Sequence, residues 1–492
     1  KIKEAMQTVD IDMYTECFIL FDECEKLVQD VHYRDSIREP MNDFFRFQNK
    51  ALISATPIVP EKDSRFDGFM RILIQPDYVY RQKLKLITTN NVLETLQEVI
   101  EAKRGTVCIF CNSIDSIDSF YRLIPELSNA CTFCSEDGQY KLWKGNRRKK
   151  SMMITELERY NFFTSRFYSA VDILCKNPPH VIFVSDLYGA AQSVIDPATE
   201  AIQIIGRFRG GVNSVTHIAS IRPELECMSS SEIDHWIQGA STIFNGWKAQ
   251  LTRTTNIGEL TLLQEAIGEN SYLPYLDENG KPDSFLIANF YEKEQVKRLY
   301  TSADLLHLAY EQTGYFVFSH EERLMPVSDN ERMAIQHRLA KKKRAELIVR
   351  KLEEMEKMSR ATDKKIQKRY QRMLMNLITS TADRYIYDCF CRFGAKFVRE
   401  ADYNENKLRT ALNVSSEHTI KKSGQMRTYI QRAFPVGAEI SVQEAKSMLR
   451  QVYKKMGLNT GRGITTKELE QYAEIENSRN REARMIKILK HK

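Results

Sequence analysis

The sequence predicts an α/β fold in which parallel sheets occupy residues 1–224 and a mainly α-helical region follows. Short apolar runs alternate with amphipathic stretches through the first part, a pattern typical of strands joined by crossover helices. From residue 225 the apolar residues recur at helical spacing instead. The length of 492 residues and the hydrophobic content of 42% indicate several domains with their own cores and exclude a wholly disordered chain.

The elements of the first part follow from these runs. The expected strands are residues 18–21, 50–54, 71–74, 83–88, 106–111, 130–134, 160–167, 180–185 and 214–220. The expected helices include residues 93–102, 114–127 and 196–207. We place the break between two α/β domains near Thr89–Asn91, where polar residues separate a strand from a helix.

Four segments are expected along the chain. Residues 1–90 and 91–224 form the two α/β domains, and residues 225–378 form a helical accessory region. Residues 329–378 within it read as one long basic helix or as two helices. Residues 379–492 read as a small basic helical domain.

The net charge of +7 is distributed unevenly. Residues 331–372 carry 15 Lys and Arg against 6 Asp and Glu, and residues 419–492 carry 16 against 7. Each stretch therefore has a net charge of +9, and the rest of the chain sums to −11. Such asymmetry indicates a nucleic-acid-binding appendage that includes Lys341, Lys342, Lys343 and Arg344. The alternative is a charged face that only solvates a helical region.

Four of the ten cysteines form two CxxC pairs whose spacing fits a zinc site. Cys108 and Cys111 lie in one apolar β-rich run, and Cys131 and Cys134 lie in another. In a strand, side chains three residues apart point to opposite faces, and neither pair has a Gly or Pro for a knuckle turn. We therefore expect buried thiols without zinc, in a reducing compartment.

Two carboxylates, Asp22 and Glu23, follow the apolar run 18–21 directly. The carboxyl end of a parallel strand is where nucleotide triphosphatases present acidic groups to phosphates. At such a position an aspartate holds Mg²⁺ and a glutamate polarises the attacking water. Taken alone, the pair also fits an ordinary acidic turn.

Two further groups of polar residues have the same ambiguity. Ser54 and Thr56 follow a second strand, where hydroxyl groups can link a nucleotide site to its neighbour or simply form a turn. On a helix, Gln203 and Arg207 share one face at four-residue spacing. An arginine presented from a second domain to a phosphate is an arginine finger, whereas the alternative is a structural arginine.

Together, the DExx, SAT and QxxGRxR sequences at 22–23, 54–56 and 203–209 resemble motifs II, III and VI of superfamily 2 helicases. Residues 107–112 are similar to motif IV, and residues 162–172 are similar to motif V. Within the superfamily, the chain resembles the herpesvirus-type replication origin-binding protein helicases of large DNA viruses, phages and mobile elements. This resemblance rests on the Thr164-Ser165 form of motif V and the short GRxR ending of motif VI.

The resemblance, which covers about residues 15–222, implies tandem RecA-like parallel-sheet domains that bind ATP and Mg²⁺ between them. It implies roles for the following residues: Asp22 as Mg²⁺ ligand; Glu23 as activator of water; Gln203 as a further catalytic residue; Ser54, Thr56 and Gly206 in ATP binding and coupling; Arg207 and Arg209 at the γ-phosphate; Asp172 at the ribose or the arginine finger; and Asn112, Thr164 and Ser165 at the nucleic acid. The implied function is an ATP-dependent DNA helicase or translocase in replication, with origin binding or unwinding as its specific role.

The chain departs from the helicase pattern at the phosphate-binding loop. The sequence contains no GxxxxGK[ST], and only 21 residues precede Asp22. We therefore expect the first RecA-like domain to be incomplete here, with its phosphate-binding loop upstream, and these residues alone to be inactive as an ATPase. Ala170 also stands where motif V usually has Gly.

Two other functions stay open, a catalytically inactive DNA-binding replication or scaffold protein and an RNA helicase. The expected partners are single-stranded or forked DNA and other replication proteins, with no membrane, since the sequence has no run of 18 apolar residues. The expected location is the cytoplasm of a bacterial host, or the nucleus or virus factory of a eukaryotic host, and not outside the cell.

We predict that Cys108, Cys111, Cys131 and Cys134 bind no zinc, because strand geometry directs the two members of each pair apart. Metal analysis of the purified protein should find no bound zinc. Stoichiometric zinc that disappears in Cys131→Ser would contradict this prediction.

Overall fold

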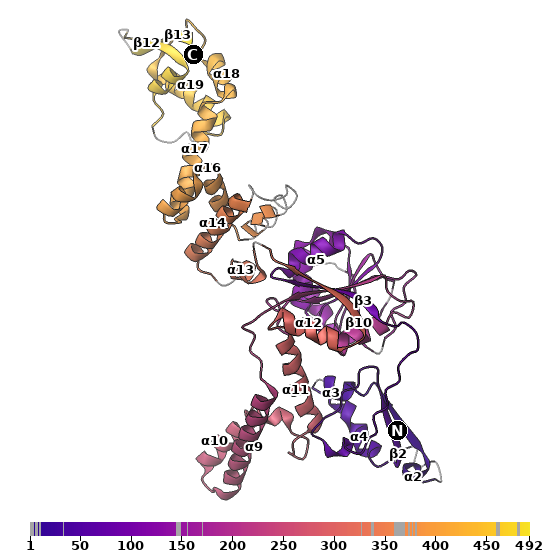
Figure 1. Cartoon of the computed structure of the whole chain (residues 1–492). Helices are drawn as coiled ribbons and strands as arrows, with labels where there is room; N and C mark the ends of the chain where they lie inside the picture. Colours follow the sequence, from indigo (N-terminus) through magenta and orange to yellow (C-terminus); the bar gives the residue numbers. More distant parts are fainter. Residues whose placement is uncertain are drawn as a thin grey trace. The chain divides into compact units, whose positions relative to one another are not determined.

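The computed structural model divides the chain into two compact units, residues 1–333 and 334–492 (Figure 1). The structure describes residues 4, 8, 11–32, 34–143, 149–154, 156–169, 171–325, 327–335, 339–358, 370–371, 374–375, 377–378, 381–458, 463–479 and 483–492. Both units contain sheets and helices, and the first unit has the parallel α/β architecture that the sequence predicts.

The first unit begins with a small parallel sheet of two strands. Strands β1 (Phe18–Asp22) and β2 (Asn49–Ile53) pair in register, with Asp22 opposite Ile53. Between the two strands lie α3 (Lys26–Gln29) and α4 (Glu39–Phe44), which bury Leu27, Val28 and Phe44 in the local core. The expected strand at 71–74 is wrong, because these residues are exposed and outside any strand.

A larger sheet follows, with eight strands among the described residues and every neighbouring pair parallel. Its strands are β3 (Gln82–Thr89), β4 (Val107–Phe110), β5 (Cys131–Phe133), β6 (Lys149–Ser151), β7 (Tyr160–Phe163), β8 (His180–Ser185), β9 (Ser214–Ser220) and β10 (Phe316–Arg323). Their order across the sheet is β10-β3-β9-β8-β4-β7-β5-β6.

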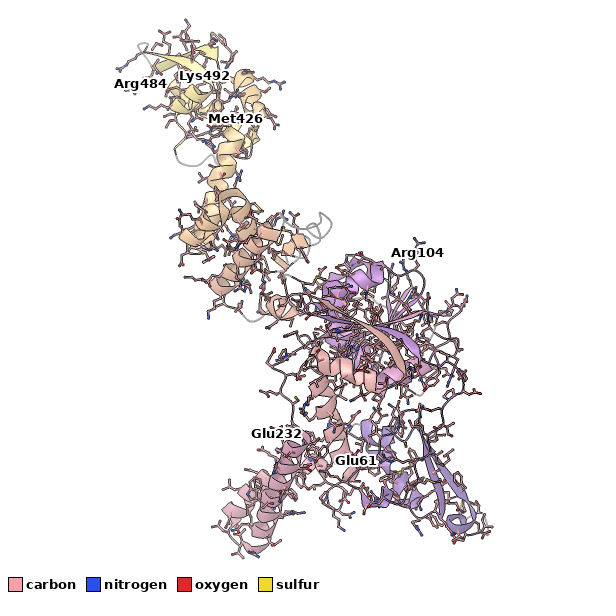
Figure 2. All side chains as sticks on the ribbon, viewed as in Figure 1. Glu61, Arg104, Glu232, Met426, Arg484 and Lys492 are labelled. Atoms are coloured by element: carbon pink, nitrogen blue, oxygen red, sulfur yellow. The ribbon has the colours of Figure 1, made fainter. Side chains whose placement is uncertain are left out.

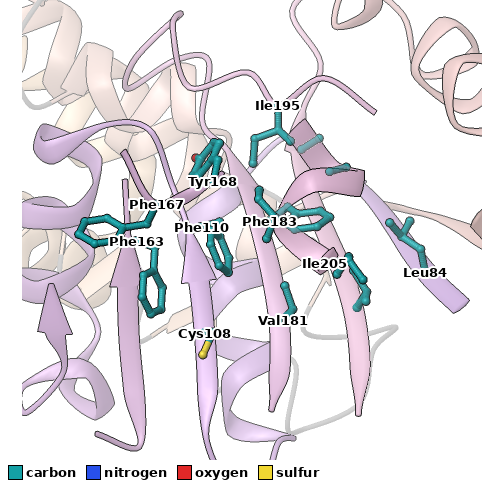
Figure 3. Close-up of a cluster of buried hydrophobic side chains, with 14 of the residues drawn as sticks. Leu84, Cys108, Phe110, Phe163, Phe167, Tyr168, Val181, Phe183, Ile195 and Ile205 are labelled. Carbon is teal, nitrogen blue, oxygen red and sulfur yellow. The ribbon is translucent and has the colours of Figure 1, made fainter. Parts of the chain in front are cut away.

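Hydrophobic clusters cover both faces of this sheet. On one face, Ile87, Ile109 and Ile182 pack with residues of α5 (Val92–Glu101) and α6 (Ile114–Leu123). On the other face, the strands present Phe110, Phe163 and Phe183, which Figure 3 shows among their neighbours. Nearly continuous apolar strands are required because a parallel sheet is buried on both sides.

The cysteines follow this division between faces. Cys108 and Cys131 belong to the cluster on the face of Phe110, whereas Cys111 and Cys134 belong to the cluster on the face of α5 and α6. All four thiols are buried. The expected divergence of side chains within each CxxC pair is thus confirmed.

The boundary expected at residues 89–91 is wrong. Strand β3 ends at Thr89 and pairs with β9, so it belongs to the larger sheet, and the change from one sheet to the other falls before Gln82. The polar residues after it mark a helix start, because the Asn91 side chain accepts the Glu94 backbone N–H as an N-cap.

Part of the chain after residue 224 also belongs to the larger sheet, so the expected domain boundary at residue 224 is wrong. Helices α9 (Ser230–Arg253) and α10 (Ile257–Gly268) pack against each other. Helix α11 (Ser284–Leu299), α12 (Ala303–Gln312) and edge strand β10 then follow. Tyr300, Leu306, Tyr310 and Phe316 complete the cluster on the face of Phe110.

A network of buried hydrogen bonds holds the segment around α12 against the larger sheet. The His217 ring lies 3.1 Å from the Ser185 hydroxyl and 2.7 Å from the Tyr310 hydroxyl. The Tyr300 hydroxyl lies 3.1 Å from Ser185 and donates to the Ile195 carbonyl at 2.7 Å. The network therefore ties strands β8 and β9 to the chain around α12 through satisfied buried hydrogen bonds.

The second unit is helical only in part. Its helices are α14 (Lys341–Met358), α16 (Arg384–Glu400), α17 (Glu405–Lys421), α18 (Gly424–Ala433) and α19 (Val442–Lys455). It also contains the three-stranded sheet β11-β13-β12, which the expectation of a helical domain at 379–492 missed. Within residues 329–378, α13 (Asp329–Met333) and α14 are separate helices, and much of 359–380 lies outside the described residues.

We predict that His217 makes the first unit less stable in acid. Burial lowers the pKa of His217 to about 3, while an unfolded chain has the ordinary value of 6.5. Between these values the unfolded state binds a proton that the folded state does not. As the pH decreases from 6.5 toward 3, the contribution of His217 to the free energy of unfolding therefore falls by up to about 1.4 kcal/mol per pH unit.

Urea unfolding of the wild type and of His217→Gln at several pH values between 7 and 4 tests this prediction. The variant should start less stable and lose less stability on acidification. The exposed His235→Gln is the control and should follow the wild type. Equal pH slopes for His217→Gln and the wild type would contradict the assignment.

Candidate functional site

The carboxyl ends of β1 and β2 bring two polar segments together. Because the strands are parallel and in register, Asp22–Glu25 and Ser54–Thr56 leave the sheet at the same edge. The Cys24 backbone N–H donates to the Ile53 carbonyl at 3.4 Å, which continues the pairing beyond the strands. This confirms the sequence expectation that both segments lie at strand ends.

Asp22 and Glu23 have unequal environments. The Asp22 side chain is exposed and accepts the Glu23 backbone N–H at 2.9 Å. Glu23 has φ of +54°, a left-handed conformation that costs a non-glycine residue about 1–2 kcal/mol. The half-buried Glu23 carboxylate lies 3.8 Å from the Arg207 guanidinium. The tight turn thus turns one carboxylate to solvent and the other toward Arg207.

Glu25 is the centre of the site, although it belongs to none of the predicted site residues. Its side chain is fully buried and accepts hydrogen bonds from the Ser54 hydroxyl and, at 3.2 Å, from the Gln203 amide. Burial raises the pKa of Glu25, and the Ser54 hydrogen bond opposes that shift. A signal existed in the sequence, since Glu25 lies two residues before the apolar pair Leu27 and Val28 and directly precedes the short helix α3 at the sheet edge.

Gln203 connects the two sheets. It lies on α8 (Glu200–Gly206), which packs on the larger sheet, and its amide also donates to the Thr56 hydroxyl at 3.0 Å. The Thr56 backbone N–H in turn donates to the Ser54 hydroxyl at 2.9 Å. Five side chains predicted separately, those of Glu23, Ser54, Thr56, Gln203 and Arg207, therefore meet around Glu25.

Arg207 and Arg209 are placed differently. Arg207 donates from Nε to the Gln203 carbonyl at 3.1 Å and from Nη2 to the Gln203 side chain at 3.3 Å. Its side chain is 12% exposed. Arg209 instead donates to Asp172 at 3.0 Å in a pair that is largely exposed. Gly206 has open space where a Cβ would lie, so packing does not require glycine there.

The residues predicted to contact nucleic acid lie elsewhere, at the carboxyl edge of the larger sheet. Asn112 follows β4 and is half-buried. Thr164 follows β7, is buried, and its hydroxyl donates to the Phe133 carbonyl at 3.4 Å. Ser165 is exposed and begins a short 3₁₀ helix, so β7 ends at Phe163 and not at 167. Ala170 lies outside the described residues.

A second polar cluster at the start of α8 was not predicted. The Gln29 amide donates to Thr199 at 2.9 Å and to Glu292 at 3.2 Å. Burial raises the pKa of Glu292 to about 7 and that of Glu200 to about 8. Both carboxyl groups therefore hold protons for part of the time near neutral pH, which reduces the repulsion between them. The cluster joins α3, α8 and α11.

In the second unit, three of the four predicted cations have carboxylate partners. Lys341 pairs with Glu405, Lys342 with Asp402 at 2.7 Å, and Arg344 with Asp383 at 2.6 Å. Asp383 is buried, so the Arg344 pair is part of the helix packing. Lys343 is exposed. Much of the charge in this cluster thus balances acidic residues of the same unit.

Comparison with protein-family models finds no match to this chain, and comparison with curated proteins also finds none. Among the described residues, none of the helices has both the length and the apolar character needed to cross a bilayer.

We predict that Glu25 and Gln203 are energetically coupled. Each single variant, Glu25→Ala or Gln203→Ala, removes their shared hydrogen bond, whereas the double variant removes it only once. A double-mutant cycle on the free energy of unfolding should give a coupling energy of about 1–3 kcal/mol.

The control cycle combines Glu25→Ala with Glu101→Ala, an exposed residue on α5, and should be additive. Additivity between Glu25 and Gln203 would mean that the contact between the two sheets contributes nothing measurable.

Proposed function

We propose that the chain contains the motor region of an ATP-dependent DNA helicase or translocase of superfamily 2 that acts in replication. The observation that carries the proposal is the buried Glu25 network at the edge of the small sheet. There Ser54 donates to Glu25, and Gln203, from a helix that packs on the larger sheet, donates to Glu25 and Thr56. Such a contact lets a change at one sheet edge alter the position of the second sheet. We assign the two sheets to tandem RecA-like domains.

The carboxylates at the end of β1 suit a nucleotide site. Mg²⁺ in phosphoryl-transfer sites takes one or two protein carboxylates, with phosphate oxygens and water as its other ligands. The exposed Asp22 fits the role of that carboxylate, and Glu23 fits the role of orienting water. The sequence has no GxxxxGK[ST] loop to cradle phosphates, so the proposal assigns no phosphate-cradling loop among these 492 residues.

Arg207 is better placed than Arg209 to act as the arginine finger. Its guanidinium is mostly buried, is held by Gln203 and approaches Glu23, so its charge lies at the edge where phosphates would bind. Arg209 and Asp172 form an exposed pair that suits a supporting role, with Asp172 orienting Arg209. Both assignments follow from the chemistry of phosphoryl transfer, in which fixed positive charge stabilises the transition state.

The nucleic-acid path is assigned to the carboxyl edge of the larger sheet. Asn112, Thr164 and Ser165 follow strands β4 and β7 there and offer amide and hydroxyl groups to a backbone. Outside the two basic stretches the chain has net charge −11, so affinity depends on the basic second unit. The partners proposed are DNA and other replication proteins.

We predict that Arg207→Ala lowers ATP turnover by about 10³–10⁵-fold while DNA binding is retained, because an arginine finger acts only on the transition state. Turnover is measured with DNA and Mg²⁺ in the protein as encoded, including any residues upstream of Lys1. Arg209→Ala should also abolish turnover, and the exposed Arg122→Ala is the control.

Single-stranded DNA should stimulate turnover more than RNA, which separates the DNA helicase from an RNA helicase. Normal turnover in Arg207→Ala with loss of DNA binding would move Arg207 to the nucleic-acid path. Absence of turnover in the complete protein would favour an inactive DNA-binding protein.

A further inference from the structure

The end of the second unit forms a small domain with its own core. Its buried cluster draws on α18, α19, the 3₁₀ helix η7 (Thr466–Gln471) and the sheet of β11 (Glu439–Ser441), β12 (Ala473–Arg479) and β13 (Arg484–His491). Ile486 and Ile488 of the central strand β13 pack in this cluster with Leu449 and Leu469. The helices therefore cover one face of the antiparallel sheet.

The hairpin of β12 and β13 extends beyond that core. Residues 476–479 of β12 are all exposed, and Arg484 at the start of β13 is exposed as well. Figure 2 labels Arg484 at this end of the hairpin. Strand β11 pairs with β13 only from Met485 onward, so the pair of Arg479 and Arg484 lies beyond the three-stranded part of the sheet. Both arginine side chains are exposed, so they gain nothing from the core and are free to contact a binding partner.

Two arginines face each other at the end of this ribbon. Arg479 and Arg484 are direct cross-strand partners. Like charges at such positions destabilise a sheet. Within the described part of the domain, neither arginine pairs with a carboxylate. Arg481 lies outside the described residues.

The rest of the hairpin is balanced in charge. Lys487 lies between Glu439 and Glu476, its partners on the two neighbouring strands, and Lys490 lies opposite Glu474. The excess positive charge is therefore confined to the arginine pair. By strand alternation Arg484 shares a face with Ile486 and Ile488, so the pair projects on the helix side of the sheet, past the core.

We propose that this end of the hairpin binds duplex DNA, with Arg479 and Arg484 contacting backbone phosphates. The planar guanidinium groups of two adjacent arginines suit phosphate oxygens. Residues 473–491 contain no Phe, Tyr or Trp, so this segment offers no stacking platform for single-stranded bases. The exposed end also lacks the apolar residues that anchor a protein in a lipid surface.

The duplex-binding hairpin shares DNA as partner with the proposed helicase function but does not depend on ATP. The two proposals therefore fail separately. Loss of ATP turnover in Arg207→Ala leaves the hairpin assignment intact, and loss of duplex binding in hairpin variants leaves basal ATP turnover intact.

The test measures the affinity of the full chain for a short duplex by fluorescence anisotropy at several salt concentrations. The double variant Arg479→Gln with Arg484→Gln should bind more weakly, and its log–log salt slope should fall by about 1 for each phosphate that the variant no longer neutralises. The matched control, Lys487→Gln with Lys490→Gln, removes the same charge from the balanced part of the hairpin and should leave the slope unchanged. Arg479→Lys with Arg484→Lys keeps the charge and should retain most of the slope.

Four outcomes would overturn the proposal. An unchanged slope in the Arg-to-Gln variant would exclude phosphate contacts by this pair. An equal loss in the lysine control would assign the effect to net charge alone. A loss of single-strand affinity in the Arg-to-Gln variant that equals or exceeds its loss of duplex affinity would exclude the duplex assignment. Binding to vesicles of anionic lipid without binding to duplex would assign the pair to a membrane surface.

Discussion

A buried carboxylate needs hydrogen-bond partners, and the arrangement of the first unit depends on how Glu25 obtains them. Its partners are Ser54 from the neighbouring strand end and Gln203 from the helix of another sheet. Removing either partner would leave polar atoms buried without compensation. The requirement therefore holds the small sheet against the larger one, and the same contact places Arg207 beside Glu23.

The second constraint is the two-sided burial of the larger sheet. A parallel sheet exposes apolar side chains on both faces, and helices must cover each of them. Helices α5 and α6 cover one face, while the chain from Tyr300 to Phe316 completes the other. The segment after residue 224 is therefore part of the core of the first unit, and His217 ties it there through buried hydrogen bonds.

Charge in the second unit has to be judged by its partners and not by its amount. Residues 331–372 and 419–492 have the same net charge, yet Lys341, Lys342 and Arg344 of the first stretch have carboxylate partners. Arg479 and Arg484 of the second face each other instead. Two like charges at facing positions destabilise a sheet, so this arginine pair argues more strongly for an anionic partner than a count of basic residues does.

The sequence by itself determined the α/β class, the parallel alternation, the strand-end positions of Asp22 and Ser54 and the divergence of the paired cysteines. These features depend on local periodicity, which a sequence displays directly. Only the tertiary structure decided that β3 and β10 belong to the larger sheet, that the last domain contains strands, and that Glu25 is the centre of the site. Those outcomes depend on partners far away in the chain, because the Glu25–Gln203 contact and the pairing of β3 with β10 form only when distant segments pack together.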